Sequence, residues 1–136
     1  MKRSATAVWK GSFKEGSGSF GVGSGAIKDV PYTFKTRFEG TVGANPEELI
    51  AAAHASCFTM ALGAQMNERG IVPESIDTHC DITFENLTLT KSVLTTTVTA
   101  PGADTAKIQE AAAAAKAGCP ISKVLKLEIV LDLKIA

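Results

Sequence analysis

Three cysteines, at positions 57, 80 and 119, are the residues of this chain best suited to covalent chemistry. A cysteine attacks an electrophile only as the thiolate, and an unperturbed thiol with a pKa of about 8.5 is mostly protonated at neutral pH. The number of cysteines is odd, and no two of them form a Cys-x-x-Cys pair. We therefore expect packed or reactive thiols rather than a framework of structural disulfides.

Cys80 is expected to be a packing residue. Apolar and polar residues alternate from Ser75 to Thr88, as in a strand with one buried face. Cys80 falls on the same face as Ile82 and Phe84, where a thiol behaves as a small hydrophobic group.

Cys57 lies in the middle of a predicted helix, where the helix dipole gives a thiolate little help because its effect is confined to the end turns. A cation must therefore approach Cys57 if it is reactive. The candidates are His54, three residues earlier on the same side of the helix, and an arginine from elsewhere in the sequence. A packed or hydrogen-bonded histidine is an equally good interpretation of His54.

Cys119 precedes Pro120 at the predicted start of a short helix that runs to Leu125. Unpaired backbone N–H groups at such a position favour a negative charge, although a purely structural cap is the alternative interpretation. Because 61 residues lie between Cys57 and Cys119, spacing alone does not show whether the two thiols meet.

A long helix is predicted from Asn45 to Gly70. Asn45 can cap it, Pro46 suits its first position, and Glu48 can complete the cap. Residues 49–67 carry no formal charge for nineteen residues, close to the length of a membrane span. The polar side chains within this stretch favour a buried central helix instead, and its apolar character on nearly every side suggests cover on several sides.

The remaining elements complete a fold of the α+β class. We expect a mostly antiparallel sheet packed on the long hydrophobic helix, in a single domain of residues 1–136. Residues 16–21 match the pattern GxGxxG, but a strand pattern follows them, so we interpret them as a turn rather than as a dinucleotide-binding loop. Strands are predicted at 4–10, 32–38, 75–88, 91–100 and 127–135, and a second helix at 104–118.

The charge balance argues against polyanionic partners. Fourteen basic and fourteen acidic side chains cancel, so the chain offers no basic field for nucleic acid or for an anionic membrane surface. The first ten residues are too short and too polar for the apolar core of a secretory signal. We therefore expect a cytoplasmic protein.

Three segments resemble the osmotically inducible protein C (OsmC) family, which is related to the organic hydroperoxide resistance (Ohr) proteins. They are Thr-Arg-Phe-Glu-Gly at 36–40, the run at 45–62 that contains His-Ala-Ser-Cys, and Gly-Cys-Pro-Ile-Ser at 118–122. The likeness extends over essentially the whole chain, and two cysteine motifs, an arginine and an acidic cap occur together in order. The His-Ala-Ser-Cys form resembles the osmotically inducible branch.

The resemblance implies a thiol-dependent peroxidase that reduces organic hydroperoxides and hydrogen peroxide in oxidative or osmotic stress defence. It further implies an intertwined homodimer with active sites at the subunit interface. By the same resemblance, Cys57 is the peroxidatic cysteine, Cys119 resolves it, Arg37 is the active-site arginine and Glu47 is its acidic partner. No metal or bound cofactor is implied, and the reductant is an external dithiol or a lipoylated protein.

Elementary chemistry agrees with these roles. The guanidinium of Arg37 is always charged, can favour a Cys57 thiolate, and can bind the carboxylate of Glu47 through its planar fork. However, Glu47 and Cys57 are ten residues apart, which is about 15 Å along a continuous helix. Both can touch one guanidinium only if the helix breaks or if Glu47 comes from another subunit, so we expect a site shared across a two-fold dimer.

Three other functions remain open on sequence grounds. A cysteine hydrolase could use Cys57 with His54 as its base, but no Asn or Asp orienter follows from spacing, and Cys119 stays unexplained. A metal site could recruit residues 54, 57, 79 and 80, although positions 79 and 80 point to opposite faces of a strand. The third is a non-catalytic dimeric module that binds an apolar ligand.

Overall fold

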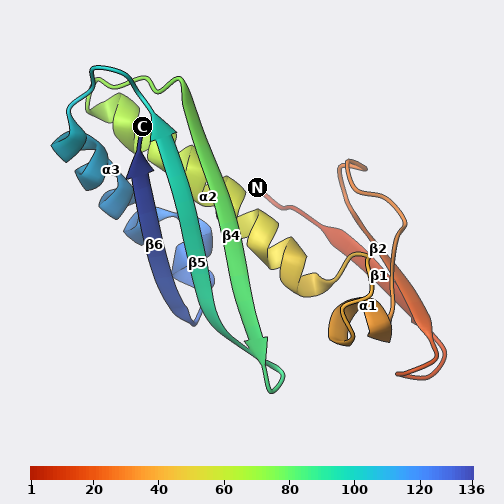
Figure 1. Cartoon of the computed structure of the whole chain (residues 1–136). Helices are drawn as coiled ribbons and strands as arrows, with labels where there is room; N and C mark the ends of the chain where they lie inside the picture. The colour runs from red at the N-terminus through yellow and green to blue at the C-terminus, as the bar shows by residue number, and fades with distance from the viewer. The chain divides into compact units, whose positions relative to one another are not determined.

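The computed structural model describes residues 1–136, and the chain separates into two compact units. Residues 1–49 form the N-terminal unit and residues 50–136 form the C-terminal unit. Figure 1 shows the elements of both units, which are described one at a time below. The organisation of residues 1–136 as a single domain stays a prediction.

The N-terminal unit is a small antiparallel sheet followed by one short helix. Strands β1 (Ala5–Lys10), β2 (Ser17–Val22) and β3 (Val30–Tyr32) pair in that order. Helix α1 (Phe34–Phe38) follows β3. The aromatic rings of Trp9 and Tyr32 lie 5.5 Å apart over β2, which has a glycine between them.

The predicted strand over residues 32–38 is wrong beyond Tyr32. Thr33 caps a helical turn instead, because its hydroxyl accepts from the backbone N–H of Thr36 and the Thr36 hydroxyl accepts from the N–H of Thr33. The rings of Phe34 and Phe38, one turn apart, then lie 4.9 Å from each other. The reciprocal cap overrides the β propensity of the aromatic and β-branched residues.

The glycine-rich segment is only partly a turn. Gly11 has a φ of +90° and Gly16 closes the loop between β1 and β2, whereas Gly18 and Gly21 are residues of strand β2. A Cβ at Gly18 would lie 2.7 Å from the ring of Trp9, so this glycine gives the aromatic rings room over the strand.

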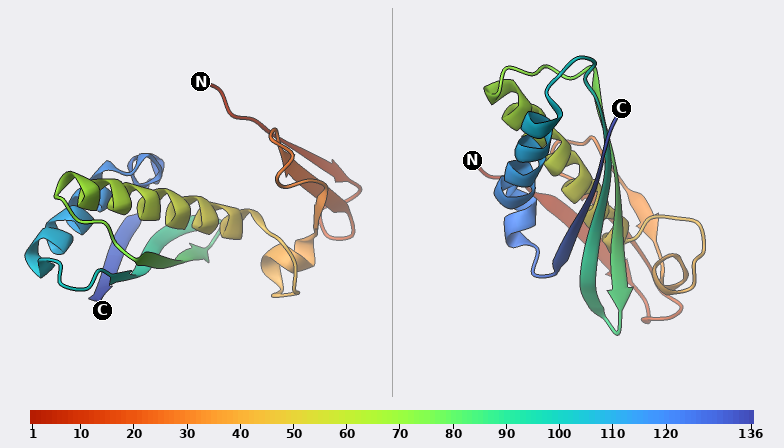
Figure 2. Two further views of the ribbon diagram at one scale, coloured as in Figure 1. Left: turned by 90° about the horizontal axis from the view of Figure 1, so that it is seen from above. Right: turned by 60° about the vertical axis from the view of Figure 1, so that its left-hand side comes forward.

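The C-terminal unit is a three-stranded sheet with helices packed on one face (Figures 1 and 2). The hairpin of β4 (Ser75–Glu85) and β5 (Thr88–Thr99) is antiparallel, as predicted, while β6 (Glu128–Ile135) pairs parallel to β5. Between β5 and β6 the chain forms α3 (Thr105–Gly118) and α4 (Pro120–Val124). Most strand pairs of the protein are antiparallel, and the predicted α+β class is confirmed.

Helix α2 (Pro46–Glu68) begins and ends close to the predicted limits. The side chain of Asn45 accepts from the N–H of Glu48 at 2.9 Å, which satisfies one of the unpaired donors of the first turn. By length and mean hydropathy this helix could cross a membrane. For one helix this is only weak evidence of a membrane span, because a helix that supplies core residues, as α2 does, has the same length and hydropathy.

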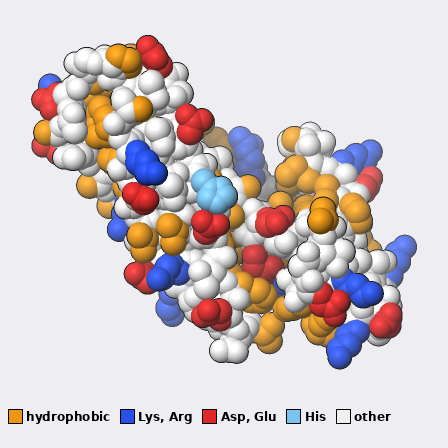
Figure 3. Space-filling model, viewed as in Figure 1, with side chains coloured by type: hydrophobic (Ala, Val, Ile, Leu, Met, Phe, Trp, Pro, Cys, Tyr) orange, Lys and Arg blue, Asp and Glu red, His pale blue; other side chains and the backbone are white.

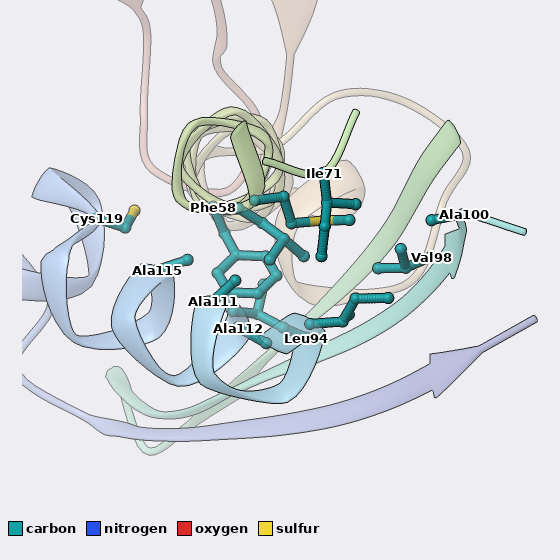
Figure 4. Close-up of a cluster of buried hydrophobic side chains, with 12 residues drawn as sticks. Phe58, Ile71, Leu94, Val98, Ala100, Ala111, Ala112, Ala115 and Cys119 are labelled. Carbon is teal, nitrogen blue, oxygen red and sulfur yellow. The ribbon is translucent and has the colours of Figure 1, made fainter. Parts of the chain in front are cut away.

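One face of α2 supplies the core of the C-terminal unit. Phe58, Leu62 and Met66 recur every four residues and are fully buried. Figure 4 shows Phe58 among side chains of α3 and the sheet, including Ala111 and Leu94. Within this chain, other residues do not cover every side of α2, because Met60 on another side of the helix is 80% exposed. The expectation of cover on several sides is therefore not met by the chain alone.

Candidate active site

The two cysteines that sequence spacing could not connect lie together. The sulfur of Cys57 in α2 and the sulfur of Cys119, just before α4, are 2.9 Å apart, and both thiols are free. A disulfide of about 2.04 Å needs only a small further approach of these sulfurs. Cys119 is fully buried and Cys57 is half-buried, so the sulfur of Cys57 is the more accessible of the pair.

A sharp corner between two helices holds Cys119 in place. Cys119 ends α3, where its N–H donates to the carbonyl of Ala115 at 2.9 Å, and it also precedes α4. Pro120 at the first position of α4 has no N–H to leave unpaired and fixes the backbone for the new helix. The Cys-Pro pair therefore turns the chain so that the thiol faces α2.

The surroundings of the two sulfurs differ in their effect on acidity. Burial raises the pKa of the Cys57 thiol, and the hydrogen bond with Cys119 raises it further, although the N–H of Ile121 acts against this. Burial also acts to raise the pKa of Cys119, but the thiol of Cys57 and donors of Ser122 and Ile121 outweigh it and lower that pKa.

The geometry of the 2.9 Å contact has the Cys119 thiol donating to the sulfur of Cys57, whereas the lowered pKa of Cys119 favours the opposite direction. The donors that gather at the sulfur of Cys119 make it the more acidic thiol of the pair within this unit. A thiolate at Cys57 requires a cation that these surroundings do not supply.

Arg37 and Glu47 form the predicted ion pair, within the N-terminal unit. Arg37 extends from α1, and its Nη2 and Nε lie 2.8 and 3.1 Å from Oε1 of Glu47 in the first turn of α2. The carboxylate is the more buried partner, with its side chain 12% exposed against 34% for the arginine. Such a forked, charge-assisted contact fixes the plane of the guanidinium.

An aromatic hollow adjoins Arg37. Its volume is about 220 Å³. The guanidinium carbon lies 5.1 Å from the ring centre of Phe38, and the ring of Phe13 lies 5.1 Å from that of Phe34. The hollow is lined by Trp9, Phe13, Tyr32, Thr33, Phe34, Arg37 and Phe38. This side of the N-terminal unit therefore combines an apolar surface with one positive charge.

His54 is fully buried and spans two hydroxyls. Its Nδ1 lies 2.7 Å from Oγ of Ser92 in β5, and its Nε2 lies 2.8 Å from Oγ of Ser122 in α4. Burial lowers the pKa of the imidazole, which favours the neutral ring. The hydrogen-bonded interpretation of His54 is the one that the geometry supports.

Cys80 is half-buried against the core, as predicted, and its sulfur lies 3.3 Å from Oγ of Ser92. Burial raises the pKa of this thiol. The hydrogen bond with Ser92 acts to lower the pKa, and the negative charge of Asp81 raises it further. Cys80 is therefore the less reactive kind of thiol.

Comparison with known proteins decides the family. The family model described as OsmC-like protein matches residues 38–134. A relative named Peroxiredoxin OsmC, from Escherichia coli, is 45% identical over 97% of this chain and 95% of its own length, and one of that name from Shigella flexneri matches equally. The chain belongs to the OsmC family.

Solved structures agree with this membership at the level of the fold. An OsmC-like protein from Vibrio cholerae has a TM-score of 0.78 at 17% identity, covering 98% of this chain and 99% of its own. The organic hydroperoxide resistance protein OhrB of Bacillus subtilis has a TM-score of 0.67 at 24% identity, covering 98% of each chain. The predicted OsmC/Ohr-like fold is confirmed.

The geometry weakens two of the rival interpretations of this OsmC-family chain. A hydrolase would need a carboxylate or amide to orient His54, but the partners of both ring nitrogens are serine hydroxyls. For a metal site, His54 is buried in the core whereas the imidazole of His79 is 73% exposed and contacts Asp81 on β4. These two side chains do not converge.

Sequence reasoning missed both serine partners of His54. For Ser122 the sequence did contain a pattern that could have indicated the contact. Ser122 follows Cys119 by three residues, just as His54 precedes Cys57 by three. Ser92 offered no such signal, since only the register of β4 and β5 brings it opposite Ile82 and beneath α2.

Proposed function

We propose that this protein is a thiol peroxidase that reduces organic hydroperoxides and also hydrogen peroxide. The observation that carries the proposal is the 2.9 Å separation of Cys57 and Cys119 in a chain 45% identical to a protein named Peroxiredoxin OsmC. Proteins of similar fold from Bacillus subtilis and Elizabethkingia anophelis are named organic hydroperoxide resistance proteins, which supports the substrate class.

Cys57 is the attacking residue in this proposal. Its sulfur is the more accessible one, and as a thiolate it attacks the outer oxygen of the hydroperoxide. A sulfur–oxygen bond forms, the oxygen–oxygen bond breaks, and the alkoxide leaves and takes up a proton as an alcohol. Cys57 becomes a sulfenic acid.

Cys119 completes the oxidative half of the cycle. Its sulfur attacks that of Cys57, the disulfide forms and the sulfenic oxygen leaves as water. An external dithiol, free or carried by a lipoylated protein, then restores both thiols by exchange and is itself oxidised to a disulfide. The two electrons pass through cysteine sulfur alone, so the cycle needs no metal or organic cofactor.

Arg37, held by Glu47, is the cation that Cys57 requires. Helix α2 is continuous from Pro46 to Glu68, so the ten residues from Glu47 to Cys57 span about 15 Å along its axis. A guanidinium bound to Glu47 therefore serves the thiol of a second chain, and we propose a homodimer with sites shared between subunits. The exposed Met60 side of α2 offers apolar surface for such a partner.

The aromatic hollow beside Arg37 suits the organic part of the substrate. A hydroperoxide with an aryl or alkyl tail would bury the tail among the rings while the guanidinium stays near the polar peroxide group. Charges of both signs are interspersed on the face shown in Figure 3, with no extended basic area for a polyanionic partner. A cytoplasmic role in oxidative or osmotic stress defence completes the proposal.

Hydroperoxide consumption by purified variants tests this function. With cumene hydroperoxide and a dithiol, Cys57→Ser should lose activity to the background rate, because the neighbouring thiol of Cys119 is fully buried and less accessible to the peroxide than Cys57. Cys119→Ser should perform one turnover and then stall, or turn over only with small thiols. Cys80→Ser is the matched control and should retain activity. A Cys57→Ser protein that still consumes hydroperoxide would refute the proposal.

A further inference from the structure

Two parallel contacts connect α2 to the segment that carries Cys119. The first joins the sulfurs of Cys57 and Cys119 at 2.9 Å, and the second joins Nε2 of His54 to Oγ of Ser122 at 2.8 Å. His54 and Cys57 are three residues apart on α2, and so are Cys119 and Ser122 at the start of α4. Residues at this spacing share a helix face, so the two contacts brace the same pair of segments.

The second contact is buried and fully hydrogen-bonded. His54 and Ser92 are 0% exposed and Ser122 is 8% exposed, so water does not compete strongly for their polar atoms. A neutral imidazole has one donor and one acceptor nitrogen. With hydroxyls at 2.7 and 2.8 Å from its two nitrogens, the ring determines the direction in which each hydroxyl hydrogen points.

Two arrangements of hydrogens satisfy these contacts, because either tautomer of the neutral ring can pair with both hydroxyls. In one of them, Ser92 donates to Nδ1 of His54 and the Nε2–H of His54 donates to the Ser122 oxygen. The Ser122 hydrogen then points away from the ring, and Ser122 acts to lower the pKa of the Cys119 thiol. A hydroxyl hydrogen at that sulfur favours the thiolate. The opposite tautomer would turn the Ser122 hydrogen toward the ring and leave the sulfur without it.

We propose that His54 and Ser122 are positioning residues for the resolving step, in which their buried hydrogen bond holds the segment of Cys119 against α2 and keeps its sulfur within reach of Cys57. The inference rests on the proposed peroxidase function. The Cys119 thiolate attacks the sulfur of the Cys57 sulfenic acid, the sulfur–sulfur bond forms and the sulfur–oxygen bond breaks. Hydroxide leaves and combines with the proton that Cys119 gave up, so one water is released for each disulfide.

His54 acts through Ser122 and is not the base in this step. A base would become an imidazolium inside the core, where burial already disfavours the charged ring. No carboxylate contacts either ring nitrogen to stabilise that charge, since both partners are serine hydroxyls. The neutral ring therefore holds Ser122 and leaves the protons of the reaction to Cys119 and the leaving hydroxide.

Single-turnover kinetics with Ser122→Ala test the inference. Reduced protein is mixed with cumene hydroperoxide, quenched with N-ethylmaleimide at successive times, and its Cys57 sulfenic acid, Cys57 sulfinic acid and disulfide are measured by mass spectrometry. Peroxide should react with Cys57 at the wild-type rate, since Ser122 takes no part in that step. Disulfide should form about tenfold more slowly, as expected for the loss of one buried hydrogen bond, the contact of Ser122 with His54. With excess peroxide, sulfinic acid should accumulate at Cys57.

Two further variants separate positioning from general loosening. Ser122→Thr keeps the hydroxyl, and its added methyl has room in a hollow of about 490 Å³ that Ser122 lines with Ala117 and Ile129, so it should restore the rate to within about twofold. Thr96→Val removes another fully buried hydroxyl, which lies 3.2 Å from that of Thr78 and does not contact the thiols, and it should resolve at the wild-type rate.

Three results overturn the inference. These are a Ser122→Ala protein that forms disulfide as fast as wild type, a Ser122→Thr protein as slow as Ser122→Ala, and a Thr96→Val protein slowed equally. Each leaves the peroxidase proposal intact as long as Cys57→Ser is inactive. Activity in Cys57→Ser would instead remove the peroxidase proposal itself.

Discussion

At the scale of single residues, the surroundings of the two thiols shift their pKa values in opposite directions. The pKa of Cys119 is lowered by donors of its own segment, whereas that of Cys57 is raised by burial within the same unit. In the proposed mechanism Cys57 must ionise first, yet its own surroundings favour the neutral thiol. In the proposed mechanism, the positive charge of Arg37, whose guanidinium is held by Glu47, stabilises the Cys57 thiolate.

Arg37→Lys tests whether the forked contact matters beyond the charge. Lysine keeps the positive charge but cannot bind Glu47 through two nitrogens, so the ammonium is free to leave the site. The second-order rate constant of Cys57 with cumene hydroperoxide should fall about 10- to 100-fold.

Arg69→Lys is the control for this substitution, because Arg69 pairs with Glu110 at 3.9 Å instead. Its rate constant should stay within about twofold of wild type. Equal rate constants for Arg37→Lys and wild type would contradict the role given to the guanidinium.

His54 also predicts how stability depends on pH. The unfolded imidazole takes up a proton below its ordinary pKa of 6.5, whereas burial keeps the folded ring neutral to lower pH. The contribution of the neutral His54 ring to the free energy of unfolding is therefore present above pH 6.5 and is lost as the pH falls below this value. Urea unfolding should show a declining free energy of unfolding from pH 7 to pH 5.

His54→Gln should flatten this decline, because glutamine does not titrate. His79→Gln, at the exposed histidine of β4, should keep the decline of the wild type. Identical slopes for wild type and His54→Gln would show that other groups cause the pH dependence.

At the scale of elements, sequence reasoning succeeded where caps and periodicity agreed and failed where a local cap opposed propensity. The limits of α2 followed from Asn45 and Pro46, and the alternation over 75–88 gave β4. The segment after Tyr32 was mistaken for a strand because the reciprocal Thr33–Thr36 cap is weak as a sequence signal.

The candidate site was predictable to a different degree. The meeting of Cys57 with Cys119 came from resemblance to a family, because no spacing rule connects residues 62 positions apart. The His54–Ser122 contact depends on how α4 lies against α2, which only tertiary packing determines.

The one-sided core of α2 predicts which substitutions in this helix destabilise the protein. Leu62→Ala should lower the free energy of unfolding by about 2–5 kcal/mol, because Leu62 is 0% exposed and its removal leaves a cavity. Met60→Ala, at an exposed position of the same helix, should change it by less than about 0.5 kcal/mol in the isolated chain. Urea unfolding at low protein concentration measures both. A larger loss for Met60→Ala than for Leu62→Ala would contradict the packing described here.

At the scale of the whole molecule, the two units divide the proposed site between them. The N-terminal unit holds the guanidinium and the aromatic hollow, and the C-terminal unit holds both thiols and their hydroxyl contacts. A homodimer that joins the Arg37 of one chain to the Cys57 of the other would unite these parts.

Mixing two inactive variants tests the shared site. Arg37→Ala and Cys57→Ser should each be nearly inactive alone. After subunit exchange, a mixed dimer should contain one site with wild-type Arg37 and wild-type Cys57 from different chains, so hydroperoxide reduction should reappear. Light scattering should give twice the mass of one chain. A mixed dimer that stays inactive would contradict a site shared between subunits.

The most direct test of the redox account is the fate of the three cysteines after one equivalent of cumene hydroperoxide. The reduced protein is oxidised, its remaining thiols are trapped with N-ethylmaleimide, and its peptides are mapped by mass spectrometry without reductant. We expect a disulfide between Cys57 and Cys119, with Cys80 recovered as the trapped thiol. Consumed peroxide with all three thiols intact, or a disulfide that contains Cys80, would contradict the account.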